Sequence, residues 1–288
     1  MRLWCRKLAF FVNEATTKTT HIKTVQIEIQ LRFLNFTYNF KAMIEIKKVS
    51  SGAIQVKSSV SDFCAAMGYC ELRIKHFLRG IRPPQTQIMI EGIASHEKEE
   101  AYEKEHFKFE PVTSEELKDL KKDIEFIREG LYTRYTKELT FGGESVSLLI
   151  YGRADKVMRS QGTLIVEDSK YPQTKDKYRD KYEPYNDQKL QTLLYLNSLF
   201  SDVTCFDQTR CFEISCNRKA WIINIKDKST LQSIKIFQGY QTKQAEDFLN
   251  QKISRFALLV LDKMQPTHHE NVNKCRSCRF KDCEYCKT

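Results

Sequence analysis

The segment "ELTFGGESVSLLIYGRADKVMRSQGTLIVEDSKYP", residues 138–172, decides the fold. Apolar and polar residues alternate along it, and turn-forming residues interrupt the alternation at Gly142-Gly143 and at residues 160–162. Such a pattern is typical of half-buried strands joined by tight turns. The segment therefore predicts a meander of three consecutive antiparallel strands.

The third predicted strand ends in Asp168 and Lys170, which lie on one face because side chains alternate along a strand. A hairpin turn at 160–162 would place Asp155 roughly opposite Asp168. Two carboxylates at one sheet edge repel each other unless a cation lies between them, and Mg²⁺ or Mn²⁺ prefers oxygen ligands. Such an ion activates water, and a lysine adds fixed positive charge. The pattern indicates metal-assisted phosphodiester hydrolysis; a solvated strand end is the plainer alternative.

The flanking segments predict a mixture of helices and strands. Helices are expected over 60–79, 87–107, 114–135, 187–200 and about 229–264, and strands within 43–60 and over 208–216 and 219–227. A basic, tyrosine-rich loop spans residues 171–185. These elements predict one α/β domain over 43–288, with a helical N-terminal part and a cysteine-rich tail. Residues 1–42 show little periodicity and are taken as an extension of uncertain role, with Met43 as an alternative start.

The composition bounds the class of protein. A chain of 288 residues with 41% hydrophobic content is large enough for one large domain or two small ones. A net charge of +10 favours polyanionic partners such as nucleic acid. The sequence has no apolar run long enough for a membrane-spanning helix, and its first residues are too interrupted by Arg and Lys for a signal peptide. We therefore expect a cytoplasmic protein without a membrane partner.

Four of the ten cysteines lie in the tail, between Cys275 and Cys286. In a reducing compartment such clustering points to metal or iron–sulfur ligation rather than disulfides. Zinc ribbons usually separate their cysteine pairs by more residues than this tail does, whereas a 4Fe-4S cluster takes closely spaced thiolates and one distant thiolate. Cys70 is the first candidate for the distant ligand and Cys64 the second. His268 and His269 are expected to be exposed tail residues rather than zinc ligands.

The acidic constellation resembles the PD-(D/E)XK nuclease superfamily, in its RecB-like branch. The histidine of "EGIASHEKEE" matches a further metal ligand of that branch, and "KLQTLLY" matches its Gln-x-x-x-Tyr motif, which borders the active site and helps to hold DNA. The resemblance implies a restriction-endonuclease-like core and the following site residues in chain order: His96, Asp155, Asp168, Lys170, Gln191 and Tyr195. Many relatives carry Glu where this chain has Asp168, which puts the position of the metal in doubt.

The cysteine pattern resembles the iron–sulfur members of that branch, namely the CRISPR-associated Cas-four family, the AddB C-terminal domain and the exonuclease V group. In these proteins one early and three late cysteines enclose the nuclease core. The resemblance spans residues 61–286 and implies a 4Fe-4S cluster on Cys70, Cys275, Cys278 and Cys283. The gap before Cys283 is one residue shorter than usual, which leaves Cys286 open as the alternative. Joining Cys70 to the tail closes a loop of roughly 200 residues and restricts the unfolded chain.

The resemblance implies a metal-dependent exonuclease that degrades single-stranded DNA from 5′ to 3′. It also implies a possible role in processing new CRISPR spacers together with integrase proteins. Some relatives form ring-shaped oligomers. A stand-alone repair, recombination or viral exonuclease would use the same residues. Two other hypotheses are a cluster-bearing DNA-binding module without activity and a scaffold with a zinc-binding tail. Lys, Arg and Tyr in the loop 171–185 suit phosphate contact and base stacking with single strands.

Overall fold

The computed structural model describes residues 44–49, 52–106, 124–198, 218–269, 271–278, 280 and 283. The extension 1–42, the strand expected over 208–216 and Cys286 lie outside the described residues. The domain boundary at residue 43 therefore stays a prediction.

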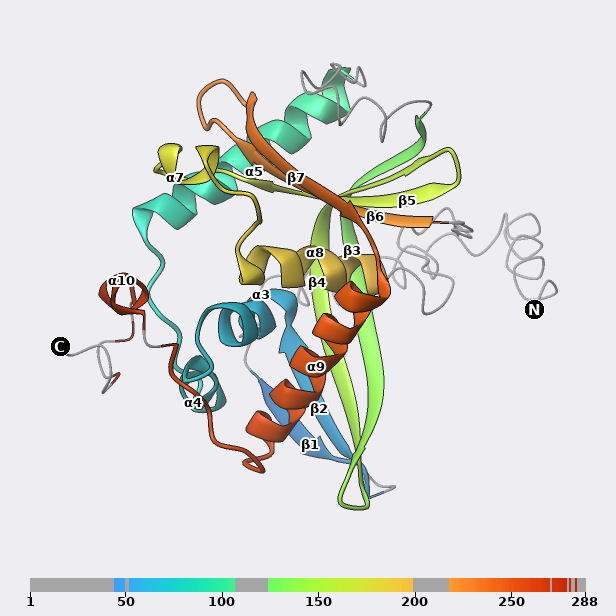
Figure 1. Ribbon diagram of the computed structural model, residues 1–288, viewed down its shortest axis with the longest axis vertical. Coiled ribbons are helices and arrows are strands. Elements are labelled where there is room, and N and C mark those ends of the chain that lie inside the picture. Colours follow the sequence, from blue (N-terminus) through green and yellow to red (C-terminus); the bar gives the residue numbers. More distant parts are fainter. Residues whose placement is uncertain are drawn as a thin grey trace, which may run out of the picture. The chain divides into compact units, whose positions relative to one another are not determined.

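One mixed sheet of seven strands forms the centre of the described fold (Figure 1). The strands are β1 (Glu45–Lys48), β2 (Ile54–Ser59), β3 (Ile124–Phe141), β4 (Glu144–Ser160), β5 (Thr163–Lys170), β6 (Arg218–Lys226) and β7 (Ser233–Tyr240). Their order is β1-β2-β4-β5-β6-β7, and β3 pairs with β4. The pairs β2–β4 and β5–β6 are parallel, and the others are antiparallel. The predicted α/β class is confirmed.

The predicted meander β3–β4–β5 is also confirmed. Its two connections are two-residue turns, Gly142-Gly143 and Gln161-Gly162, in which every residue has a positive φ. Such backbone suits the twist of the flanking strands and favours glycine. The turn chemistry therefore fixes which residues of β4 and β5 stand opposite each other.

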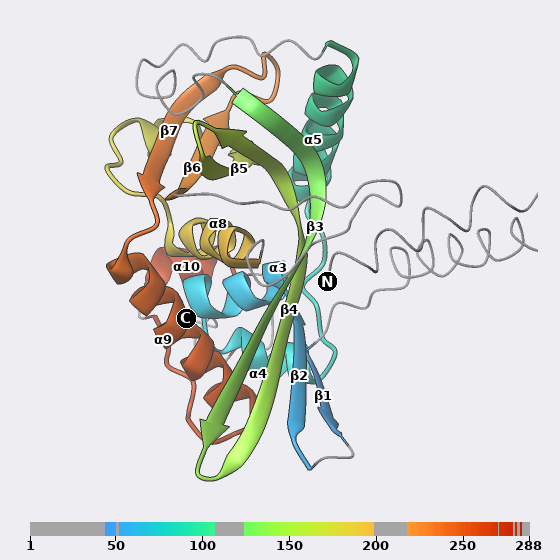
Figure 2. The same cartoon turned by 90° about the vertical axis from the view of Figure 1, so that its right-hand side faces the viewer.

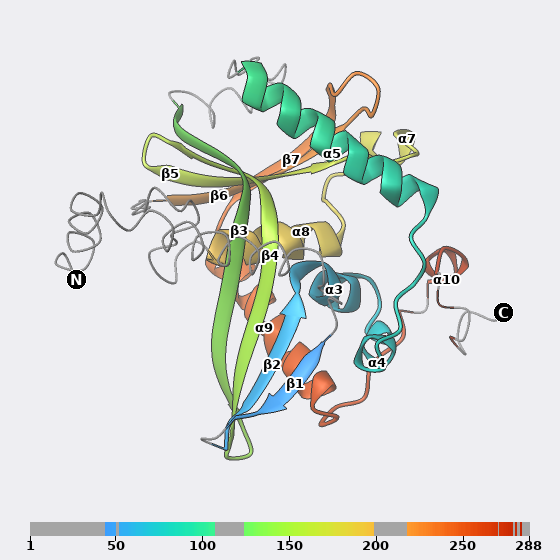
Figure 3. The same cartoon turned by 180° about the vertical axis from the view of Figure 1, so that it is seen from behind.

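Helices lie on both faces of the sheet, and their bounds are α3 (Val60–Cys64), the π-helical turn η1 (Ala65–Tyr69), α4 (Arg73–Leu78), α5 (Gln87–His106), α7 (Asp176–Arg179), α8 (Asn186–Ser198), α9 (Lys243–Val260) and α10 (Val272–Arg276). Helices α3, α8 and α9 share one face, and α5 lies on the other (Figures 2 and 3). The main core lies under α8, where Leu190, Leu193 and Leu194 are fully buried at helical spacing. The adjacent strands β4 and β5 thus lie between α8 and α5.

The helix expected over 114–135 is wrong in its described part, because residues 124–135 belong to β3. Ile124, Ile127 and Leu131 follow a helix-like spacing in sequence. The strand instead pairs with β4 along nearly its whole length, from Ile124 to Phe141. Long-range pairing therefore overrides the local pattern.

Two other helix predictions need correction. The helix expected over about 229–264 is two elements, because β7 pairs with β6 and α9 begins only after Thr242, whose hydroxyl caps it by accepting a hydrogen bond from the Ala245 amide. The helix expected over 60–79 is interrupted after η1. Cys70 stands at the interruption in extended backbone, with φ −158° and ψ 118°. The break takes this cysteine out of helical geometry.

Candidate active site

The two acids meet across the β4–β5 hairpin. The paired residues of β4 and β5 end at Lys156 opposite Glu167, and Asp155 and Asp168 are the next residues of the two strands beyond this pair. The Asp155 carboxylate accepts a hydrogen bond from the Ser169 amide at 3.0 Å. Glu167 points elsewhere and accepts a hydrogen bond from the Asn224 amide group at 2.9 Å. The hairpin therefore selects Asp168, not Glu167, as the partner of Asp155.

Asp168 forms the floor of the group and is fully buried. Its Oδ2 atom lies 2.7 Å from Nζ of Lys170, while Oδ1 is buried and accepts no hydrogen bond from the described residues. Burial, together with the charge of Asp155, raises the pKa of Asp168 to about 7 against the attraction of Lys170. Burial also raises the pKa of Asp155. Burial thus opposes ionisation of both carboxyl groups, against the attraction of Lys170.

His96 of α5 approaches the acids from the other helix layer. Its Nδ1 atom lies 3.5 Å from Oδ2 of Asp155, and its ring packs edge-on against Tyr171 with centroids 4.9 Å apart. Burial, together with the charge of Lys170, lowers the pKa of His96 to about 4. The imidazole is therefore neutral at physiological pH, which is the form that binds metals.

Gln191 and Tyr195 of α8 complete the group. Lys170 Nζ donates to Gln191 Oε1 at 3.1 Å, and Gln191 Nε2 donates to the Tyr195 hydroxyl at 3.4 Å. Gly152 of β4 permits this approach, because a Cβ atom there would lie 2.9 Å from the Tyr195 ring and 2.8 Å from a Val60 methyl group. The six residues predicted as the site thus form one continuous series of contacts.

A sequence model of the PD-(D/E)XK nuclease superfamily matches residues 63–286. The chain belongs to this superfamily. No curated protein sequence matches this nuclease.

Solved structures similar to this nuclease include three with low sequence identity. SSO0001 is 16% identical, with 81% of this chain and 88% of that chain covered and a TM-score of 0.42. A putative exonuclease from Eubacterium rectale is 13% identical, with 77% and 87% covered and a TM-score of 0.41. The alkaline exonuclease LHK-Exo from Laribacter hongkongensis is 11% identical, with 72% and 89% covered and a TM-score of 0.39. At these TM-scores, membership of the superfamily rests on the sequence match.

The donor set at the hairpin fits a hard divalent cation. Two carboxylates and one neutral imidazole converge there, and the buried Oδ1 of Asp168 lacks a hydrogen-bond donor among the described residues. A buried polar atom without a partner is costly unless something else satisfies it. His96, Asp155 and Asp168 are therefore the residues that would hold Mg²⁺ or Mn²⁺.

Metal affinity is expected to depend on pH through Asp168. Because its pKa is about 7 in the metal-free site, a proton competes with the ion below that pH. The association constant for Mn²⁺ should fall about tenfold per pH unit below 7 and level off above it. Titration calorimetry between pH 5.5 and 8 measures this, and His96, with a pKa of about 4, does not titrate there. A constant affinity across this range would contradict the assignment.

The cysteine tail docks against the segment around Cys70. The Tyr69 hydroxyl donates to the Lys274 carbonyl at 2.8 Å, and Thr267 N donates to Glu71 Oε2 at 2.8 Å. Phe280 stacks on His76 with centroids 4.3 Å apart. These contacts flank Cys70 on both sides in sequence and hold the tail beside it.

Of the two early cysteines, Cys70 is the one near the tail. Burial raises the pKa of its thiol, and the charges of Cys278 and Cys283 act in the same direction. The thiol of Cys64 lies instead among the catalytic candidates, where burial raises its pKa and the charge of Asp168 adds to this effect. The described cysteines form no disulfide. Cys70 therefore stays the first candidate for the distant ligand and Cys64 the second.

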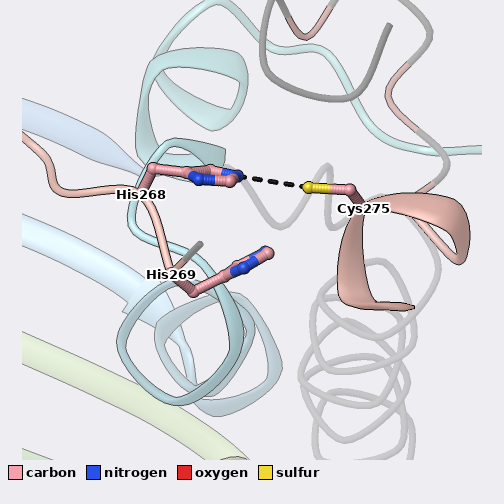
Figure 4. A group of neighbouring side chains, drawn as sticks. All are labelled: His268, His269 and Cys275. Atoms are coloured by element: carbon pink, nitrogen blue, oxygen red, sulfur yellow. Dashed lines mark hydrogen bonds between the residues drawn. The ribbon is translucent and has the colours of Figure 1, made fainter. Parts of the chain in front are cut away.

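Cys275 lies beside two histidines that the sequence analysis did not expect to be ligands. His268 Nε2 lies 3.2 Å from its sulfur, and the ligand atoms of His268, His269 and Cys275 lie within 4.8 Å of one another (Figure 4). However, His269 Nδ1 accepts a hydrogen bond from the Asn271 amide at 2.9 Å, so the proton of its neutral ring lies on Nε2. A metal-binding histidine usually donates through its second nitrogen, so His269 is a poorer ligand than His268.

Several residues around the site were not predicted. Glu100 and Arg153 form a pair with both distances at 2.7 Å, which ties α5 to β4. Glu99 is a residue of α5 whose side chain is buried. One signal in the sequence could have indicated Glu99 and Glu100: they follow His96 by three and four residues and so share its side of a helix.

Proposed function

We propose that this nuclease is a metal-dependent exonuclease for single-stranded DNA, cutting from 5′ to 3′ and carrying a 4Fe-4S cluster. The observation that carries the catalytic part is the cluster of Asp155, Asp168, His96 and Lys170, in which the buried Oδ1 of Asp168 accepts no hydrogen bond from the described residues. Nucleases of this superfamily typically use divalent metals. The strand preference, the polarity and the cluster rest on the resemblance and on the features argued below.

The site residues have different roles in the proposed hydrolysis of the phosphodiester bond. His96, Asp155 and Asp168 would hold a divalent ion, which would lower the pKa of a bound water molecule and neutralise charge on the scissile phosphate. Lys170 is held between Asp168 and Gln191, so its ammonium group is oriented before substrate arrives. A fixed charge of this kind stabilises the transition state without reorganising. Tyr195 limits the movement of Gln191 through their hydrogen bond.

The loop 171–185 supports binding of single strands. Lys175 pairs with Asp227, and Lys235 donates to the Arg179 carbonyl at 3.4 Å, so the loop is anchored to the β6–β7 end that neighbours Lys170. Tyr182 is 97% exposed and its ring is available for stacking. Bases stack on such rings only when they are unpaired, whereas phosphates meet the loop's basic residues in either form of DNA.

Replacing Tyr182 with alanine is expected to weaken binding of a single-stranded oligonucleotide by at least about fivefold, since stacking contributes roughly 1–3 kcal/mol per base. Binding to a blunt duplex should change little. Fluorescence anisotropy with both ligands measures this difference. Tyr240→Ala is the matched control, because Tyr240 is 49% exposed and lies at the opposite end of β7 from Lys235. Equal losses for both ligands would argue against stacking.

The assay for the proposed activity is degradation of end-labelled DNA with Mg²⁺ or Mn²⁺. Label at the 5′ end should be released as short products at once, while label at the 3′ end should pass through a ladder of shortened strands. A circular single strand should resist, because it has no end. Cleavage of the circle would support an endonuclease, and retention of every substrate would support a cluster-bearing DNA-binding module.

The tail has two candidate occupants. The docking of Cys278 and Cys283 near Cys70 supports the cluster, and the 3.2 Å contact between His268 and Cys275 supports a single zinc ion. Cys275 cannot serve both at once. Iron and zinc content of protein purified without oxygen, together with its visible absorption, separates them, because a 4Fe-4S protein is brown and a zinc protein is colourless.

The likeness to the Cas-four family supports a place in processing new CRISPR spacers beside integrase proteins, in the cytoplasm. A stand-alone repair, recombination or viral exonuclease would need the same catalytic residues. Co-purification with an integrase distinguishes the first role, and the oligomeric state measured in the same experiment tests ring formation. Among the described residues, no helix has the length and apolar character needed to cross a bilayer.

A further inference from the structure

Helix α5, which carries His96, meets the sheet with a polar face. Among its described side chains, residues 87–102, the buried ones are Ser95 and Glu99, while Ile90 and Ile93 are exposed. A helix held by the hydrophobic effect shows the opposite distribution. Polar contacts must therefore hold α5 against the sheet.

Glu99 makes the buried part of these contacts. One carboxylate oxygen accepts a hydrogen bond from Lys226 of β6, and the other accepts one from the Tyr171 hydroxyl just after β5. Lys156 of β4 lies 4.0 Å from the first oxygen. All four residues are at most 8% exposed. One buried side chain thus connects the helix to three successive strands of the sheet order.

The same contacts reach His96. Glu99 follows His96 by three residues, so the two side chains project from neighbouring positions on one face of α5. Tyr171, which donates to Glu99, also packs edge-on against the His96 ring. The ring in turn lies 3.5 Å from Asp155. A shift of Glu99 would therefore move the imidazole relative to the acids.

We propose that Glu99 is a positioning residue for metal binding, whose buried carboxylate fixes α5 on the sheet and holds the His96 imidazole beside Asp155. The inference rests on the proposed metal site and adds a residue that does not touch the ion. Lys226 and Tyr171 serve as the anchors on the sheet side. Groups that orient a metal ligand typically change metal affinity 10- to 100-fold when they are altered.

The test is Mn²⁺ binding by titration calorimetry with the full chain. Glu99→Gln, which keeps the shape and removes the charge, should weaken binding about tenfold, and His96→Ala should weaken it at least as much. The double variant should bind no more weakly than His96→Ala, because Glu99 acts through His96. Glu97→Gln is the control, since Glu97 is an exposed acid on the same helix. Wild-type affinity in Glu99→Gln, or multiplied losses in the double variant, would overturn the proposal.

A spectroscopic reading separates positioning from general loss of structure. Pulsed electron paramagnetic resonance of bound Mn²⁺ should show nitrogen coupling from the imidazole in the wild type, and this coupling should be lost in Glu99→Gln as in His96→Ala. If Glu99→Gln does not fold, Tyr171→Phe takes its place, because it removes one hydrogen bond to Glu99 and keeps the ring against His96. Unchanged nitrogen coupling and affinity in that folded variant would overturn the proposal.

Failure of this inference is distinguishable from failure of the metal site. If His96→Ala and Asp168→Asn weaken Mn²⁺ binding while Glu99→Gln does not, the metal site stands and the role of Glu99 is wrong. If neither His96→Ala nor Asp168→Asn changes Mn²⁺ binding, both the site and the role of Glu99 are wrong.

Discussion

Asp168→Asn is expected to lower metal-dependent DNA cleavage by at least about a thousandfold and to make the metal-free protein more stable. The substitution keeps the size of the side chain and removes the fully buried charge at the floor of the site. Loss of a metal ligand and of the activated water removes most of the catalytic stabilisation, for which roughly 4 kcal/mol corresponds to a thousandfold.

The gain in stability follows from the sign of the pKa shift. The pKa of Asp168 is raised from 3.8 to about 7 on folding, so the unfolded chain loses its proton first and stability falls as the pH rises from about 4 to 7. Three pKa units correspond to about 4 kcal/mol in the free energy of unfolding. The substitution also removes the nearest counter-charge of Lys170, which offsets part of this gain. A net gain of about 2 kcal/mol is therefore expected at pH 8.

Urea unfolding in the presence of a chelator measures this gain, and it should vanish near pH 4. Asp247→Asn is the matched control, because Asp247 is an exposed acid of α9 that pairs with Lys243 at 2.9 Å. It should change neither activity nor the pH profile. An inactive Asp168→Asn that is also less stable at pH 8 would point to a structural role for this carboxylate instead of a functional one.

If the proposed 4Fe-4S cluster is present, Cys70→Ser is expected to remove it and to lower the free energy of unfolding by up to about 5 kcal/mol. A link from Cys70 to the tail closes a loop of roughly 200 residues, and restriction of the unfolded chain by a loop of that length has about this value. The unfolding midpoint should fall by about 10–20 °C. Iron content and differential scanning calorimetry under nitrogen measure the two effects.

Cys64→Ala serves as the control for this substitution. Cys64 is also buried, but it lies near Asp168 and Lys170 rather than near the tail. It should keep its iron. The contacts of Tyr69 and Glu71 with the tail do not involve sulfur, so the tail should stay docked in the metal-free protein. Full iron content in Cys70→Ser would exclude Cys70 as a ligand.

The β4–β5 hairpin could be predicted from the sequence because its signals are local, whereas His96, Gln191 and Tyr195 were expected from the resemblance to the superfamily. Alternation and two glycine-containing turns define β4 and β5, and Asp155, one residue beyond the last pair, accepts a hydrogen bond from the Ser169 amide of the facing strand. The apolar spacing of α8 likewise predicted the helix that carries Gln191 and Tyr195. In each case the sequence signal lies within one helix or within two strands that are adjacent in the chain.

The rest depends on partners distant in sequence. Strand β3 has helix-like apolar spacing and becomes a strand because β4 offers it a full set of backbone partners. Lys226 lies 127 residues from Glu99, and no local pattern connects them. The polar face of α5 even contradicts the rule by which a packed helix is recognised. Charged contacts between distant residues, unlike apolar periodicity, leave no trace that one sequence can show.

The two-residue turn Gln161-Gly162 fixes the register of β4 and β5. It therefore fixes which residues of the two strands face each other at the active site. Insertion of a single residue would slide one arm past the other by one position and send its acid to the far side of the sheet. Lengthening both arms equally would leave the acids facing each other. Homologues that keep this two-residue connection should therefore vary the spacing between their acids in steps of two, never one.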